Sequence, residues 1–394
     1  MMIANSMIFD SIGQHKSAIK EISDFIYHNP ETAFTEHQAA AAQIEFLRAN
    51  GFKVESPYGG LDTAYDAVYG DGTPHIAILA EYDALPEIGH ACGHNLICAT
   101  ALAAGTAVKD LMQKNDCKGT LHIIGTPGEE GSGGKAVMLS NDAFDNIDCA
   151  LICHPYSATL PDQGALAVSR FDVEFHGSPS HAATAPHEGK NALDAMTLFF
   201  NGINAWRQQL PPLSRVHGVI SNGGNVPNII PDYSSAVFYV RAASIKVQEE
   251  MEQRFIRIAQ GAALMTDTRV ETRKQKNSYL PILLNAPLNN FFTDHASDFG
   301  LDISPCNPQG MISTDFGNLS CRVPGCNWFI QITDDGAVLH TEQFKAAAGS
   351  IHAFEQSMKM AAAMAQAALK AMTETEFLDA IKQDFAARQV LKVL

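Results

Sequence analysis

The sequence predicts an α/β fold in which a mixed sheet with flanking helices is interrupted by an inserted, ferredoxin-like α+β domain. Short apolar runs of β type occur at residues 75–80, 120–126 and 150–153, with a long helical stretch between the first two. Near residue 164 the pattern changes to an alternation of apolar and polar residues. A chain of 394 residues also exceeds what one hydrophobic core usually supports. We therefore expect two domains.

Helices come first in the predicted order. Apolar residues recur at helical spacing over residues 11–28, and residues 35–50 have the pattern of a capped helix that Gly51 ends. A further helix is predicted from residue 95 to about residue 114. Helices that alternate with apolar strands indicate a sheet with helices on its faces.

The inserted domain is predicted over residues 165–277, and the larger domain over residues 1–164 and 278–394. In the insert, Phe171, Val173 and Phe175 alternate with polar residues, as in a half-exposed antiparallel strand. There follow a helix at 191–209, strands at 216–221 and 235–241, a helix at 245–264 and a strand at 269–273. This β-α-β-β-α-β order is the split unit of a ferredoxin-like sandwich.

The larger domain resumes after the insert. Residues 327–332 form an apolar run, and residues 342–372 form one alanine-rich helical stretch. The high alanine content indicates that this stretch is buried against other helices.

Composition excludes several classes of protein. The formal net charge of −16 and the lack of a long Lys/Arg run argue against a nucleic-acid partner. No apolar run reaches the roughly 18–20 residues that a membrane span needs. The N-terminal residues lack the pattern of a secretory signal, and eight cysteines are too sparse for a disulfide framework. We expect a cytoplasmic protein with reduced cysteines and no membrane partner.

Residues 81–95 contain several metal-ligand types within a short segment. Cys92 and His94 are one residue apart, so both side chains can turn toward one ion where the backbone is extended or turning. Pro86, Gly89 and Gly93 favour such a backbone. The segment indicates half of a metal site.

The second motif is the adjacent pair Glu129 and Glu130 in a glycine-rich turn after an apolar run. From extended or turning backbone, neighbouring side chains point in different directions, so one carboxylate can bind metal while the other faces a water molecule. Metal-assisted hydrolysis requires this division of roles. A solvated acidic loop is the better interpretation of an isolated Glu-Glu pair, but the placement after a strand favours the functional one.

His154 and His340 are weak candidates when each is taken alone, because a lone histidine is more often structural. Their positions add weight. Asp83 and Cys92 follow the first predicted strand, the Glu pair the second, and His154 the third. Active sites of open α/β sheets lie at that edge.

In combination, the motifs resemble those of metallopeptidase family M-20, the aminoacylase and glutamate-carboxypeptidase superfamily, over essentially the full chain. The resemblance is strongest to the amidohydrolase branch that contains auxin-conjugate, hippurate and aminobenzoyl-glutamate hydrolases and β-alanyl-lysine dipeptidase-like proteins. The motifs that carry it are residues 82–86, 90–95, 127–130, 153–155, 180–182, 228–231, 313–316 and 340–341.

The resemblance implies a dinuclear metal centre. Cys92 would bridge two divalent ions, and the other protein ligands would be His94, Glu130, His154 and His340. Zinc suits these ligands, and manganese, cobalt or nickel are alternatives. Glu129 would be the general base and later the general acid. Asp83 would orient a ligand without binding an ion itself.

The resemblance also implies that the insert is a dimerisation and lid domain. His181 would reach the active site of a partner subunit and stabilise the oxyanion. Asn228 and Arg241 would hold the carboxylate or carbonyl oxygen of the substrate, so a homodimer is expected. From the residues alone, a loop histidine and a surface salt bridge remain open for His181 and Arg241.

Asn95 departs from the branch, many of whose members have Asp after the metal histidine. Together with Glu81 and the segment around Thr314, it points to the aminobenzoyl-glutamate and β-alanyl-lysine side of the branch. This argues against simple hippurate or auxin-conjugate hydrolysis.

The sequence thus predicts a metal-dependent amidohydrolase or peptidase that acts on an N-acyl amino acid or small dipeptide. A more specific alternative is an aminobenzoyl-glutamate or β-alanyl-dipeptide hydrolase. Two other classes stay open: a catalytically decayed, metal-bound ligand-binding dimer, and a metal-free cysteine hydrolase that uses Cys92.

Overall fold

The computed structural model describes residues 4–275, 278–305, 312–334 and 336–393, with side chains described up to residue 389. The chain forms two compact units: unit 1 comprises Met1–Gly164, Ile282–Gly310 and Thr314–Leu394, and unit 2 comprises Ala165–Pro281 and Met311–Ser313. The predicted domain limits at residues 1, 277 and 394 lie outside the described residues.

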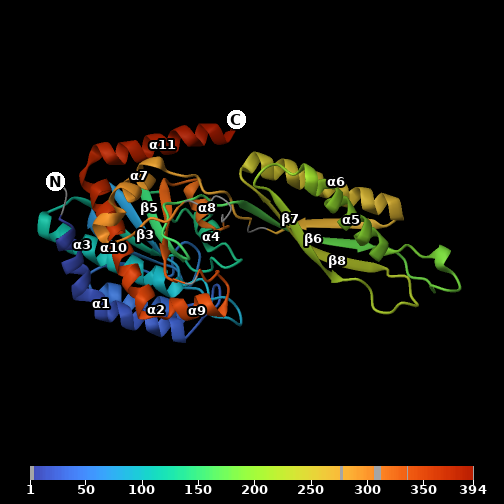
Figure 1. The fold of residues 1–394 in the computed structure, drawn as a ribbon, viewed down its shortest axis with the longest axis horizontal. Helices are drawn as coiled ribbons and strands as arrows, with labels where there is room; N and C mark the ends of the chain where they lie inside the picture. The colour runs from blue at the N-terminus through green and yellow to red at the C-terminus, as the bar shows by residue number, and fades with distance from the viewer. Residues whose placement is uncertain (1–3, 276–277, 306–311, 335, 394) are drawn as a thin grey trace. The chain divides into compact units, whose positions relative to one another are not determined.

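Unit 1 is built on a mixed six-stranded sheet, as predicted (Figure 1). Its strands are β1 (Lys53–Glu55), β2 (Tyr65–Asp71), β3 (His75–Ala80), β4 (Gly119–Gly125), β5 (Cys149–Tyr156) and β10 (Gly325–Gln331), in the spatial order β1-β2-β4-β3-β5-β10. Strands β3, β4, β5 and β10 run parallel, while β1 and β2 add an antiparallel edge. This edge was not predicted, because β1 has only three residues and β2 ends in the polar segment Tyr69-Gly70-Asp71.

Helices flank this sheet. They are α1 (Asn5–His28), α2 (His37–Ala49), α3 (His94–Asn115), α4 (Gly134–Leu139), α7 (Ala286–His295), α8 (Phe316–Ser320), α9 (Glu342–Ala348), α10 (Ile351–Thr373) and α11 (Thr375–Val393), with a short 3-10 helix at Ala296–Phe299. Helices α3 and α10 pack against each other and against the sheet, and α1 packs on α3. The many alanines of α10 are buried in these contacts, as the sequence indicated.

The prediction of one helix over residues 342–372 is wrong. The structure breaks it at Gly349 and Ser350, where Ser350 has extended backbone and its side chain accepts a hydrogen bond from the N–H of Ala353 at 3.1 Å. A Cβ at Gly349 would lie 2.6 Å from the ring of Tyr27. Glycine is a poor helix former and serine is a good helix N-cap, so Gly349 ends α9 and Ser350 begins α10, and the close approach of Tyr27 leaves room only for glycine at residue 349.

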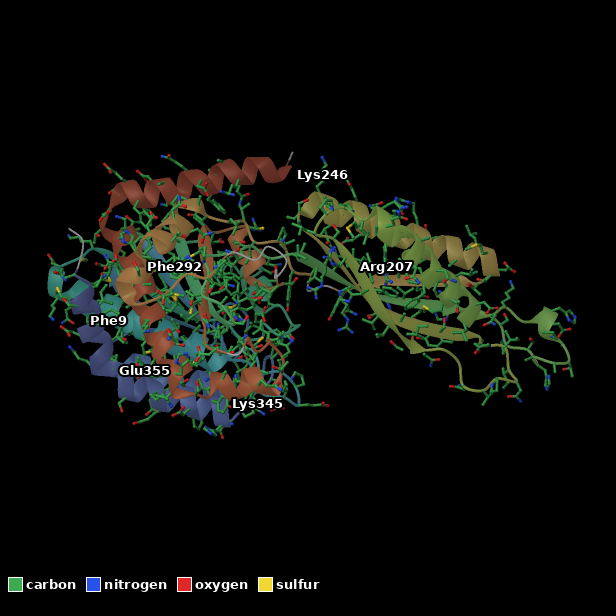
Figure 2. The ribbon with its side chains drawn as sticks, viewed as in Figure 1. Phe9, Arg207, Lys246, Phe292, Lys345 and Glu355 are labelled. Atoms are coloured by element: carbon green, nitrogen blue, oxygen red, sulfur yellow. The ribbon has the colours of Figure 1, made fainter. Side chains whose placement is uncertain are left out.

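The core of unit 1 continues around β10. Phe292, labelled in Figure 2, is fully buried and stacks on Trp328 with ring centroids 4.6 Å apart. Aromatic side chains of this size supply large buried areas. The contact attaches α7, which was not predicted, to the sheet.

Unit 2 has the predicted β-α-β-β-α-β order. It comprises β6 (Ala167–His176), α5 (Ala192–Trp206), β7 (Arg215–Asn222), β8 (Tyr233–Ala242), α6 (Ile245–Thr266) and β9 (Arg269–Lys274), with 3-10 helices at Pro186–Glu188 and Arg207–Gln209. The antiparallel strand order is β7-β8-β6-β9. Alternate residues of β6 and β8 pack on the two helices through a cluster of phenylalanines, including Phe171, Phe199, Phe238 and Phe255.

No helix among the described residues is long and apolar enough to cross a membrane. No disulfide joins the seven cysteines in the described part of the chain.

Candidate active site

Most candidate active-site residues of unit 1 come from segments that follow, or end, neighbouring strands of its sheet. Asp83 lies three residues after β3, and Glu129 and Glu130 lie shortly after β4. His154 lies inside β5, which extends to Tyr156, beyond the predicted end at residue 153. His340 lies just before α9.

Two tight turns bring these segments together. Gly93, the N-cap of α3, has φ = 76°, and a Cβ there would lie 2.9 Å from the ring of Pro155. Gly134 lies so close to the carbonyl oxygen of Pro127 that a Cβ would lie 1.7 Å from it. Only glycine permits both the left-handed backbone at Gly93 and these close approaches. The turns therefore place His94 next to the end of β5 and fold the glutamate turn back on itself.

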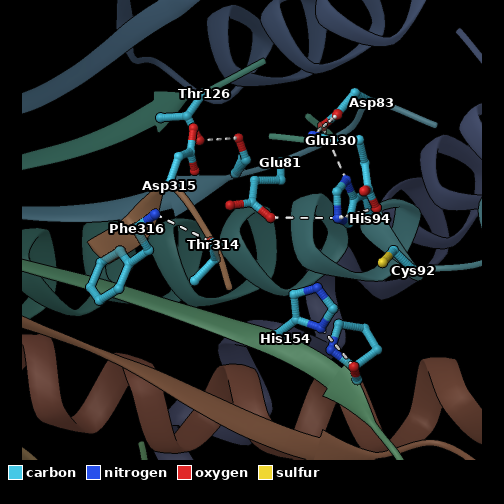
Figure 3. A network of polar contacts seen from close by, with 12 residues as sticks. Glu81, Asp83, Cys92, His94, Thr126, Glu130, His154, Thr314, Asp315 and Phe316 are labelled. Atoms are coloured by element: carbon cyan, nitrogen blue, oxygen red, sulfur yellow. Dashed lines mark hydrogen bonds and ion pairs between the residues drawn. The ribbon is translucent and has the colours of Figure 1, made fainter. Parts of the chain in front are cut away.

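Two groups of ligand atoms share one thiol. Atoms of Cys92, His94 and His154 all lie within 4.8 Å of one another, and so do atoms of Cys92, Glu130 and His340. Figure 3 shows Cys92, His94, Glu130 and His154 facing a common space. The five candidate ligands are thus brought together by the fold, with Cys92 common to both groups.

Asp83 connects two of these ligands. Its Oδ1 lies 3.0 Å from Nδ1 of His94, and its Oδ2 accepts a hydrogen bond from the backbone N–H of Glu130 at 2.8 Å. Nδ1 of His154 donates to the carbonyl oxygen of Pro155 at 2.7 Å. With both Nδ1 atoms engaged, the Nε2 atoms of the two histidines keep a lone pair for a cation.

The donor set fits divalent cations. Among the described residues, Nε2 of His94 and one carboxylate oxygen of Glu130 are buried without a hydrogen-bond partner. Buried polar atoms without partners are costly in a protein. Thiolate, imidazole and carboxylate ligands together suit zinc and other first-row divalent ions.

His340 has a strained backbone. Its φ is 65°, in the left-handed region, and its N–H donates to the carbonyl oxygen of Ala91 at 3.0 Å. Its Nε2 lies 3.0 Å from Sγ of Cys92. Residues held in this conformation cluster at functional sites, and here the conformation brings the imidazole to the shared thiol.

Electrostatics set Glu129 apart from its neighbour. Burial raises the pKa of its carboxyl well above the usual range, and the nearby carboxylates of Glu130 and Glu81 raise it further. Burial lowers the pKa of His154 to about 4, which keeps its imidazole neutral. A neutral imidazole can bind metal, and a carboxyl with a raised pKa is suited to proton transfer.

A buried lysine was missed by the sequence analysis. Lys135 is fully buried, and its Nζ lies 2.5 Å from Oε1 of Glu81 and 2.6 Å from Oδ1 of Asp315. Burial lowers the pKa of Lys135, but the two carboxylates more than offset this, so the pKa lies above its usual range. A lysine directly after a glycine-rich turn was the available signal, but nothing in the sequence indicated its partners.

In unit 2, His181 and Asn228 lie side by side on exposed loops. The N–H of Ala182 donates to the carbonyl oxygen of Asn228 at 3.0 Å. Nδ1 of His181 accepts hydrogen bonds from the N–H groups of Ala183 and Thr184 at 3.2 and 3.3 Å. In a neutral ring the proton is then on Nε2, which leaves that nitrogen as a hydrogen-bond donor.

Arg241 lies at the end of β8 and is held on several sides. Its Nε donates to Nε2 of His217 at 3.3 Å, its Nη1 donates to the hydroxyl of Ser313 at 2.6 Å, and its guanidinium lies over the ring of Tyr239 at 5.5 Å. None of these three neighbours is acidic. These contacts therefore do not support the alternative that Arg241 forms a surface salt bridge. His217 was missed, because a strand histidine gives no sequence signal.

Comparisons with known proteins identify the family of the chain. Residues 61–375 match the family described as Peptidase family M20/M25/M40. The chain is 35% identical to the Xaa-Arg dipeptidase of Mus musculus, over 96% of this chain and 91% of the mouse protein. It is 37% identical to one of the subunits of the p-aminobenzoyl-glutamate hydrolase of Escherichia coli, over 74% of this chain and 65% of that one.

Solved structures show the same fold at lower sequence identity. The aminobenzoyl-glutamate utilization protein of Klebsiella pneumoniae superimposes with a TM-score of 0.68 at 19% identity, over 93% of this chain and 98% of that one. A dinuclear metal binding peptidase from the M20 family of Bacillus subtilis gives 0.62 at 18% identity, over 88% and 98%. The match to the family covers most of the chain, so the protein belongs to peptidase family M20/M25/M40 and is a hydrolase that acts on amide or peptide bonds.

Proposed function

We propose that the protein is a dinuclear metal-dependent amidohydrolase that cleaves N-acyl amino acids or small dipeptides with a free carboxylate. The observation that carries this proposal is that Cys92 belongs to two ligand groups, with Glu129 directly beside them in sequence. A thiol common to two groups is suited to bridging two ions.

Cys92, His94, Glu130, His154 and His340 would hold the two ions. Zinc is the expected metal, with manganese, cobalt or nickel as alternatives. When bound, divalent ions supply Lewis-acid polarisation of the scissile carbonyl and lower the pKa of water to about 7. Asp83 orients the imidazole of His94 and fixes the backbone of Glu130 through the two contacts described above.

Glu129 acts as general base and then general acid. It takes a proton from the attacking water and gives it to the amine that leaves when the amide bond breaks. Its raised pKa favours the second step, while cations at the adjacent ligands would shift the pKa back toward the range that the first step needs.

The polar end of the substrate binds to groups from unit 2. Arg241 and Asn228 hold its carboxylate or carbonyl oxygen, because a planar guanidinium is the preferred partner of a carboxylate. His181 donates from Nε2 to the developing oxyanion. One such donor contributes about 3–4 kcal/mol to the stabilisation of the transition state.

We propose further that unit 2 forms the interface of a homodimer and closes over the substrate, with His181 serving the active site of the partner subunit. The enzyme is expected in the cytoplasm.

Light scattering of the purified protein measures the oligomeric state. Mixing the two inactive variants His181→Ala and Glu129→Gln tests the shared site. In a mixed dimer, the subunit with natural Glu129 receives natural His181 from the other subunit, so one of the two sites is intact and activity should return.

A hydrolysis screen on metal-defined protein tests the reaction. We would test Xaa-Arg dipeptides and aminobenzoyl-glutamate first, because two relatives are named for them, and then β-alanyl dipeptides and acyl amino acids. Release of the free amino acid supports the proposal. Stoichiometric metal and substrate binding without any turnover would instead indicate a catalytically decayed binding protein.

A further inference from the structure

Lys135 is an unusual feature of unit 1, because its ammonium is fully buried next to the candidate metal ligands. Burying a charge is costly unless it is paired, and Glu81 and Asp315 pair it at 2.5 and 2.6 Å. Both carboxylates are also buried. An apolar side chain could fill the same volume without this cost, so packing alone does not account for a lysine.

The three residues connect separate segments of the site. Glu81 follows the last residue of β3, and Lys135 is the second residue of α4, directly after the turn that carries Glu129 and Glu130. Asp315 precedes α8 and also accepts a hydrogen bond from the backbone N–H of Lys135 at 2.8 Å. Lys135 is therefore held through both its backbone and its side chain.

Glu81 extends this connection to the ligands. One of its oxygens binds Lys135, and the other lies 3.7 Å from Nε2 of His94 (Figure 3). This second oxygen is buried and has no hydrogen-bond partner among the described residues. The lysine thus fixes a carboxylate whose free oxygen is directed at the ligand nitrogen of His94.

We propose that Lys135 is a positioning residue for the reaction: through Glu81 and Asp315 it holds the Glu129–Glu130 turn at a fixed place relative to His94. This inference rests on the role proposed for Glu129. In this proposal the lysine acts through its two carboxylate partners and not as a ligand of the ions. Loss of the tether removes none of the five ligand side chains but lets the turn that carries the general base move, and a displacement of about 1 Å can cost about 100-fold in rate.

Three variants test the proposal. Lys135→Met removes the tether but leaves two buried carboxylates unpaired, so it can reduce folding. Lys135→Met combined with Asp315→Asn also removes the tether. In the natural chain the charges of Glu81, Asp315 and Lys135 sum to −1, and in the double variant the charge of Glu81 alone keeps the cluster at −1. Glu81→Gln leaves the ion pair between Lys135 and Asp315 intact and is the variant that folds most readily.

Substitutions of residues that support metal ligands typically cost about 10- to 100-fold in activity or metal affinity. We expect kcat to fall by that factor in all three variants, with KM within about twofold of the natural enzyme. The metal-to-protein ratio should remain unchanged. Thermal unfolding should show the double variant more stable than Lys135→Met.

Lys382→Met is the matched control. Lys382 pairs with Asp148 at 2.6 Å on the surface, so its substitution should leave kcat unchanged.

A kcat equal to that of the natural enzyme, in the double variant or in Glu81→Gln, would overturn the proposal. A fall in kcat that is fully explained by the fall in melting temperature across the variants would also overturn it. Glu129→Gln in the same assay separates this outcome from failure of the proposed function. If Glu129→Gln is inactive while the Lys135 variants are fully active, only the positioning role is wrong. If Glu129→Gln is active, the proposed function itself falls.

Discussion

The two units present their candidate functional groups in opposite ways. In unit 1, Asp83, His94 and Lys135 are almost completely buried and are fixed by hydrogen bonds to other protein groups. In unit 2, His181 and Asn228 are exposed, and Arg241 is half-buried with neutral partners. In unit 1 the candidate groups are therefore fixed in place by the protein itself. In unit 2 the candidate groups remain accessible to solvent or have only neutral partners.

The difference predicts that metal binding and proton transfer depend on unit 1, and that ground-state binding of the substrate depends on Arg241 and Asn228 of unit 2, where only His181 is proposed to act in the transition state. Groups that act in the bond-breaking step should affect kcat, while groups that hold the ground state should affect KM. The following experiments test this division, beginning with the largest effect.

Metal removal should abolish activity. A chelator followed by desalting should reduce turnover to background, and added zinc, manganese or cobalt should restore it. The melting temperature should rise when metal is added back, because a ligand that binds only the folded state stabilises it. Full activity after chelation, with the metal content verified, would instead support a cysteine hydrolase that uses Cys92.

Glu129→Gln should lower kcat by about 10²- to 10⁴-fold, the range contributed by a general acid or base. The amide preserves size and removes proton transfer, so the metal content should stay close to that of the natural enzyme. Steady-state kinetics and metal analysis on the same preparation measure both quantities. Undiminished kcat would show that another residue is the base.

Arg241→Ala should raise KM by about 10- to 100-fold for substrates with a free carboxylate, since hydrogen bonds to charged groups contribute about 1.5–3 kcal/mol. The corresponding carboxamide substrates should be much less affected. Arg273→Ala is the control, because Arg273 lies on β9 of the same sheet and pairs with Glu174. Equal KM changes in the two variants would contradict the assignment.

Glu36 should make the stability of unit 1 depend on pH. Burial, and then the charge of Asp83, raise its pKa from 4.5 to about 7. Between these values the native state binds more protons than the unfolded state, so the free energy of unfolding decreases as pH rises from about 4.5 through 7. The rise in pKa corresponds to about 3 kcal/mol.

Glu36→Gln should remove this dependence. We expect its melting temperature to exceed that of the natural protein by several degrees at pH 8 and to differ less at pH 5, as calorimetry can measure. Glu45→Gln, at an exposed position of α2, the helix that Glu36 caps, serves as control. A melting curve of Glu36→Gln that keeps the natural pH dependence would show that Glu36 is not the group responsible.

The sequence predicted much of this organisation because the relevant signals are local. Strand β3 has the predicted bounds, since the five apolar residues 76–80 between His75 and Glu81 leave little choice. The element order of unit 2 followed from alternation and helical spacing. The helix break at Gly349 and Ser350 was missed, because a single glycine is tolerated within many helices and the close approach of the Tyr27 ring from α1, which leaves room only for glycine there, is a long-range contact.

By itself, the sequence determined the types of ligand and their order along the chain, because Cys, His and Glu in glycine-rich turns after strands have a recognisable chemistry. The tertiary structure brings them together: Cys92 belongs to both ligand groups, as the family resemblance implied, and only the structure reveals that Lys135 is enclosed by Glu81 and Asp315. The reason is that such contacts join residues up to 248 positions apart in the chain, as between Cys92 and His340. Local spacing carries no information about contacts over that separation.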